Sequence, residues 1–118
     1  NAVKRLLTLD PLPEAIFCCS NLLSLGALTA FKDAKVKIPE DMAFVSFDDL
    51  NTGSILNSPL TCVAQRIRDI GMKAVELIME MIELRSVPNK VETVPTELIV
   101  RESCGHLLRE KKGLKCGS

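Results

Sequence analysis

Hydrophobic residues in this chain occur in two kinds of pattern, short continuous runs and longer segments with helical spacing. The runs at residues 15–19 and 42–47 are almost wholly apolar, which is typical of buried strands. Between them, residues 22–31 carry leucine or phenylalanine at every third position, which predicts a helix. Gly26 is expected to let this helix pack closely against a neighbour. This succession is the first indication of an α/β fold.

Patterns of the same kinds predict the remaining elements. They are a helical segment at residues 2–9 that ends before Pro11, a short strand at 61–64, a long helix at 66–84, a final strand at 97–100 and a polar tail at 105–118. Strands that alternate with helices imply parallel pairing, so we expect a parallel sheet covered by helices on both faces. The long helix is apolar on nearly all sides, so the 118 residues are not expected to form a self-sufficient monomer.

Polar pairs follow the first two predicted strands. Ser20 and Asn21 follow the first strand, and Asp48 and Asp49 follow the second. Ligands of open α/β sheets bind beyond the carboxyl ends of the strands, so this pattern predicts a small-molecule site with at least one carboxylate. Two alternatives stay open: the Ser20-Asn21 pair caps the following helix, and one of the two aspartates pairs locally while the other meets the ligand.

Composition narrows the function classes. Fifteen basic and fifteen acidic side chains in 118 residues give a net charge of +0, which removes the electrostatic case for binding nucleic acid or an anionic membrane. No apolar run approaches the roughly 20 residues that a membrane helix needs. The first residues already read as folded sequence rather than as a signal peptide, so we expect a cytoplasmic protein.

Cysteine and histidine usage argues against metal, cofactor and catalytic chemistry. The five cysteines are an odd number without a C-x-x-C pair, which fits a reducing cytosol and no metal site. Cys18 and Cys19 lie in an apolar run and are expected to be core residues. The one histidine, His106, lies in the polar tail without a companion base, and the glycines are scattered singly, so neither an enzyme nor a phosphate-binding cofactor loop is expected.

Four segments, in order, carry a resemblance to the lac-repressor-like (LacI/GalR) family of bacterial transcription regulators. They are residues 13–28 (PEAIFCCSNLLSLGAL), 38–49 (IPEDMAFVSFDD), 58–65 (SPLTCVAQ) and 95–104 (PTELIVRESC). Each resembles the corresponding family segment, and together they span most of the chain.

The resemblance implies a type I periplasmic-binding-protein-like fold of two lobes, of which this chain is a part. It assigns residues 1–58 to the C-terminal lobe, 59–91 to a crossover strand and helix of the N-terminal lobe, 92–104 to a return strand and 105–118 to the polar tail. A helix-turn-helix headpiece, absent from these residues, binds operator DNA in the family. A sugar-binding protein of the periplasmic transport type, which shares the fold, is the alternative.

The resemblance also implies site residues. Asp48 matches the aspartate that binds effector hydroxyls or ring nitrogens, and Gln65 matches a polar position that lines the interlobe cleft. Ser20 and Asn21 stand where the family usually has asparagine and aspartate, so they are further ligand-binding candidates. The implied partners are a small-molecule effector, expected to be a sugar, and a second copy of the chain. In the homodimer Ile55 and Leu56 are expected to pack across the interface.

Overall fold

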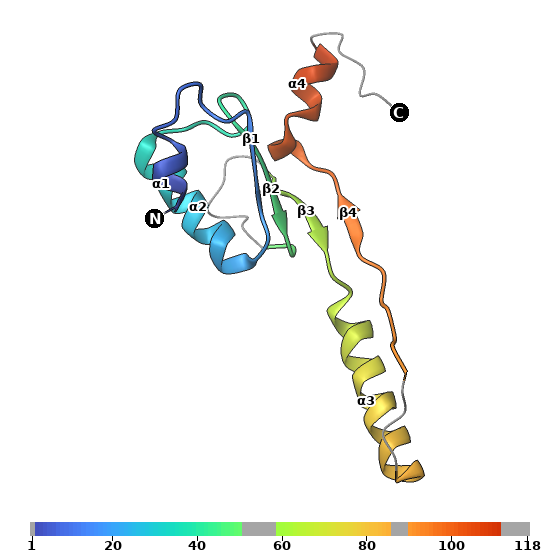
Figure 1. Cartoon of the computed structure of the whole chain (residues 1–118). Coiled ribbons are helices and arrows are strands. Elements are labelled where there is room, and N and C mark those ends of the chain that lie inside the picture. Colours follow the sequence, from blue (N-terminus) through green and yellow to red (C-terminus); the bar gives the residue numbers. More distant parts are fainter. Residues whose placement is uncertain (1, 51–58, 86–89, 112–118) are drawn as a thin grey trace. The chain divides into compact units, whose positions relative to one another are not determined.

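The computed structural model describes residues 2–50, 59–85 and 90–111 (Figure 1). In chain order the elements are α1 (Ala2–Leu6), β1 (Ala15–Cys18), α2 (Asn21–Ala34), β2 (Ala43–Phe47), β3 (Thr61–Ala64), α3 (Ile67–Leu84), β4 (Glu97–Ile99), the 3-10 helix η1 (Glu102–Cys104) and α4 (His106–Lys111). The chain forms two compact units. Unit 1 contains residues 1–64 and 98–118, and unit 2 is Gln65–Glu97.

The sheet has the strand order β1-β2-β3-β4. The pairs β1–β2 and β2–β3 are parallel, with Cys18 opposite Ser46 and Ser46 opposite Cys62. The predicted α/β class with parallel pairing is therefore confirmed. Because parallel strands end at the same edge, the residues that follow β1, β2 and β3 all leave the sheet there.

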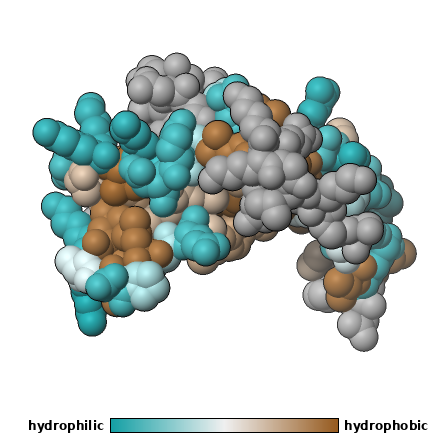
Figure 2. All heavy atoms as spheres, turned by 90° about the horizontal axis from the view of Figure 1, so that it is seen from above, coloured by the Kyte–Doolittle hydropathy of each residue, from teal (hydrophilic) through white to brown (hydrophobic). Residues whose placement is uncertain are grey.

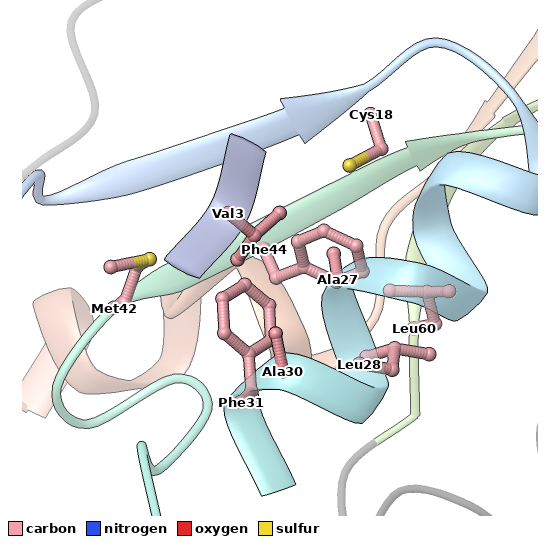
Figure 3. Close-up of a cluster of buried hydrophobic side chains, with 9 residues drawn as sticks. All are labelled: Val3, Cys18, Ala27, Leu28, Ala30, Phe31, Met42, Phe44 and Leu60. Atoms are coloured by element: carbon pink, nitrogen blue, oxygen red, sulfur yellow. The ribbon is translucent and has the colours of Figure 1, made fainter. Parts of the chain in front are cut away.

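The core of unit 1 lies between α1, α2 and the sheet (Figure 3). Phe31 of α2 meets Phe44 of β2 edge to face, with ring centroids 5.3 Å apart and an interplanar angle of 81°. This geometry suits the charge distribution of aromatic rings. The buried cluster consists of Val3, Cys18, Ala27, Leu28, Ala30, Phe31, Met42, Phe44 and Leu60.

The opposite face of the sheet is only partly covered. Phe17 is 56% exposed, although its strand neighbour Cys18 is buried. The expectation of a sheet covered on both faces is therefore wrong for the part of the chain that the structure describes. The prediction that both adjacent cysteines are core residues also fails, because Cys19 is exposed. Consecutive strand residues point to opposite faces, so an apolar run does not bury all its members when one face is open.

Unit 2 consists of α3 and the extended segment after it, and no residue of α3 is buried. Ile67 is 72% exposed and Ile78 is 55% exposed. Exposed apolar side chains also occur on α2, where Leu22 is 82% exposed. On the face of the molecule in Figure 2, apolar atoms likewise reach the surface between hydrophilic side chains. No helix among the described residues has the length and apolar character to cross a membrane.

The strand Thr61–Ala64 pairs with β2, and the compact units divide at Gln65. The assignment of residues 59–91 to the N-terminal lobe stays a prediction. Two other features differ from the expected organisation. The expected polar tail begins with the helix α4, His106–Lys111. A Cβ atom added at Gly26 would meet no heavy atom within 4 Å, so the close packing expected there is absent among the described residues.

Candidate functional site

The carboxyl end of β1 leads directly into α2. Ser20 has an extended backbone (φ −161°, ψ 158°), and its Oγ accepts a hydrogen bond from the Leu23 amide at 3.4 Å. Ser20 is therefore the N-cap of α2, as its residue type predicts, and Asn21 is the first residue of the helix and is exposed. Because Cys18 pairs with Ser46, Ser20 and Asp48 occupy equivalent positions two residues beyond this pair.

The backbone of Asp48 is fixed on both sides at the carboxyl end of β2. Its φ of 72° lies in the left-handed region, which non-glycine residues seldom adopt. Its amide donates to the carbonyl of Val63 at 2.9 Å, and its carbonyl accepts a hydrogen bond from the buried Ser46 hydroxyl at 3.0 Å. The Ser46 side chain thus stabilises the turn.

Asp49 forms a two-pronged ion pair with Arg101. Arg101 Nη1 donates to Asp49 Oδ1 at 2.8 Å, and Nη2 donates to Oδ2 at 2.7 Å. The same Nη1 also donates to the carbonyl of Leu60 at 2.7 Å. The hydrogen bonds from Arg101 hold the pKa of the Asp49 carboxyl below its ordinary value. The sequence left open which of the two aspartates pairs locally. The structure shows that Asp49 does so, with Arg101.

The segment that carries Arg101 is bound to the start of β3 by its backbone. The Thr61 hydroxyl donates to the Arg101 carbonyl at 2.7 Å and accepts from the Arg101 amide at 2.8 Å. The buried Ser103 hydroxyl donates to the Phe44 carbonyl at 2.6 Å and accepts from the Thr61 amide at 2.8 Å. Residues of three of the sequence segments, 38–49, 58–65 and 95–104, thus meet in one network.

The sequence did not single out Arg101 or Ser103 as functional residues. They are 52 and 59 residues from their respective partners Asp49 and Phe44, so no local pattern reveals the contacts. The available signal was their place in the segment at residues 95–104, which resembles the family's.

The remaining candidates lie elsewhere or outside the described chain. Gln65 directly follows β3 and begins unit 2, where its carbonyl accepts from the Ile67 amide at 3.0 Å. Ile55 and Leu56 lie outside the described residues. His106 has its Nδ1 3.6 Å from the Cys104 sulfur. Within the described ranges, no group of three or more histidine, cysteine, aspartate or glutamate residues is arranged to hold a metal ion.

Comparison with known proteins gives one family and many relatives. The family described as "Periplasmic binding protein-like domain" matches residues 1–104. The HTH-type transcriptional repressor MelR of Bacillus subtilis (strain 168) is 36% identical over 108 residues, which cover 92% of this chain and 31% of that protein. The HTH-type transcriptional repressor PurR of Pasteurella multocida (strain Pm70) is 32% identical over 101 residues, covering 86% of this chain and 30% of that protein.

Among solved structures, a LacI family transcriptional regulator from Arthrobacter sp. FB24 in complex with lactose superimposes with a TM-score of 0.72. It is 27% identical, and the match covers 87% of this chain and 40% of that one. The chain spans about a third of the length of the two curated relatives, 31% of MelR and 30% of PurR.

Proposed function

Because the chain belongs to the periplasmic binding protein-like domain family, we propose that it is the effector-binding part of a bacterial transcription regulator and binds a sugar. The resemblance to lac-repressor-like regulators is confirmed by relatives that are transcriptional repressors, a class of proteins that are not enzymes. Operator DNA would be bound by a helix-turn-helix headpiece outside these 118 residues. A regulator that acts on chromosomal DNA works in the cytoplasm.

The position of Asp48 is the observation that carries the proposed ligand site. Asp48 follows a central parallel strand, and its backbone is held by Val63 and Ser46. An ionised carboxylate offers two acceptor oxygens, which suits two adjacent sugar hydroxyls. Ser20 and Asn21 add polar groups at the end of the neighbouring strand. Gln65, the residue directly after β3, stays a ligand-binding candidate on the family resemblance alone. A sugar is also supported by the lactose bound to the related Arthrobacter regulator.

The alternative is a sugar-binding protein for transport. The curated relatives are repressors, which favours the regulator. Fluorescence anisotropy of the full-length protein with DNA from its own promoter region separates the two: a regulator binds this DNA and changes its affinity when sugar is added. A full-length protein that binds sugar but has no affinity for DNA supports the transport function instead.

Replacing Asp48 tests the site directly. In the full-length protein, Asp48→Ala removes a charge-assisted hydrogen bond and should weaken sugar binding by about 10- to 150-fold, or roughly 1.5–3 kcal/mol. Calorimetry against a panel of pentoses, hexoses, lactose and nucleobases measures the effect. The control is Asp33→Ala, which removes an exposed carboxylate whose ion pair with Lys4 spans 3.8 Å. Equal affinity of the wild type and Asp48→Ala for the effector found in the panel contradicts the assignment.

We also propose that the regulator is a homodimer in which Ile55 and Leu56 contact the partner. Helix α2 supports an interface, because Leu22 is 82% exposed and Leu23 is 56% exposed on its first turn. Exposed apolar residues that gather on one surface often mark protein contacts. Sedimentation equilibrium of the full-length protein should show a weaker dimer after the double change Ile55→Ser and Leu56→Ser. An equally tight dimer would remove these residues from the interface.

A further inference from the structure

The two adjacent aspartates have separate environments. Both carboxylate oxygens of Asp49 accept hydrogen bonds from one guanidinium, at 2.8 Å and 2.7 Å. This leaves Asp49 poorly suited to accept hydrogen bonds from a sugar, since its acceptor oxygens already have charged donors. The ion pair therefore points to a structural role for Asp49, distinct from the ligand role proposed for Asp48.

The conformation of Asp48 needs support from its surroundings. An aspartate with a φ of 72° is in a sparsely populated region, and such residues persist where neighbouring contacts fix them. Asp48 is held through its amide by Val63 and through its carbonyl by Ser46. The next residue is Asp49, whose side chain is bound by Arg101. The ion pair therefore adds a third restraint, on the residue that directly follows Asp48.

Arg101 is itself well anchored. Its amide and carbonyl both bond to the Thr61 hydroxyl, at 2.8 Å and 2.7 Å, and its Nη1 donates to the Leu60 carbonyl at 2.7 Å. The guanidinium thus extends from the start of β3 to the turn after β2. A planar guanidinium can bind both carboxylate oxygens and a carbonyl at once, which the compact ammonium group of lysine cannot do with the same geometry.

We propose that Arg101 is a positioning residue for the ligand site: by binding Asp49 at two points, it holds the preceding Asp48 in the left-handed conformation that presents its carboxylate at the carboxyl end of β2. The ligand role of Asp48 rests on the proposed function, whereas the effect on the Asp48 backbone does not.

The experiment uses two conservative variants of the full-length protein, Arg101→Lys and Asp49→Asn. Arg101→Lys keeps the positive charge but loses the two-pronged geometry, and Asp49→Asn keeps the size of the side chain but loses its charge. The matched control is Asp33→Asn, which breaks the exposed ion pair of Asp33 with Lys4 in the same unit. The first readout is the set of backbone ¹³C shifts of Asp48 after selective aspartate labelling, which report φ and ψ. The second is calorimetric titration with lactose, and thermal melts verify that each variant is folded.

In both variants we expect the Asp48 shifts to move away from left-handed values, and lactose affinity to fall about tenfold, the loss of one hydrogen bond's contribution. The control should change neither. Unchanged Asp48 shifts in both folded variants overturn the proposal, and so do altered shifts with unchanged lactose affinity. If the wild-type protein does not bind lactose, lactose is excluded as the ligand of the proposed function, and the Asp48 shifts alone decide the role of Arg101.

Discussion

The helices of the two units have similar apolar content but opposite burial. In α2, the residues Ala27, Leu28, Ala30 and Phe31 are each at most 3% exposed. In α3 no residue is buried, although its apolar positions recur at helical spacing as regularly as those of α2. An apolar stripe therefore shows that a helix can bury a face, and a neighbouring surface decides whether it does.

The way each helix is connected to its neighbours along the chain explains why α2 is buried and α3 is not. α2 lies between β1 and β2, which pair with each other, so the helix packs back onto the sheet that they form. Among the described residues of unit 2, only the extended segment that follows α3 is available to pack against it. The contacts there include the exposed ion pairs of Lys90 with Glu80 at 3.8 Å and with Glu92 at 2.9 Å. Such pairs contribute little to stability, and they do not cover an apolar face.

The largest expected effect comes from truncating one apolar side chain in each unit of the 118-residue chain. Phe44→Ala removes a fully buried ring that contacts Phe31 and should lower the free energy of unfolding by about 3–5 kcal/mol. Ile78→Ala, at a position that is 55% exposed, should change it by less than about 0.5 kcal/mol. Urea unfolding followed by circular dichroism measures both. A loss of several kcal/mol for Ile78→Ala would show that α3 is covered in solution, and the comparison between the units would fail.

A smaller difference in the free energy of unfolding is expected when one polar side chain is removed from each unit. Ser103→Ala leaves the Thr61 amide and the Phe44 carbonyl without their buried hydroxyl partner, which should cost about 2 kcal/mol. Lys90→Ala breaks two exposed ion pairs of unit 2 and should leave the unfolding midpoint nearly unchanged. Parallel urea titrations of the two variants test this order, and a greater loss for Lys90→Ala would reverse it.

The smallest change in stability is expected when one glycine in each helix is replaced by alanine. A Cβ atom at Gly26 of α2 or at Gly71 of α3 meets no heavy atom within 4 Å. Each change to alanine should stabilise the chain by about 0.5–1 kcal/mol, because alanine loses less backbone entropy in a helix. Thermal melts of both variants provide the measurement. Destabilisation by Gly26→Ala alone would indicate that a partner surface lies against α2 in solution.

Local sequence patterns were sufficient to predict the order and type of most elements. The apolar runs predicted β1 and β2 to within one residue, the short strand Thr61–Ala64 was predicted with its observed bounds, and Ser20 was expected as a helix cap. These features depend on local periodicity and on the capping chemistry of single residues. The polar residues at the carboxyl ends of the strands were also visible, because a strand and the residue after it are adjacent in the chain.

Only the tertiary structure decided which groups meet. Asp48 and Asp49 are alike in sequence, and it is Arg101, 52 residues away, that pairs with Asp49. Strand pairing placed β3 in unit 1, and the open face of the sheet exposed Phe17. Contacts between distant residues depend on how strands pair and which faces are covered. Local sequence patterns encode neither the strand pairing nor the covering of faces, because burial and long-range hydrogen bonds are properties of the assembled layers.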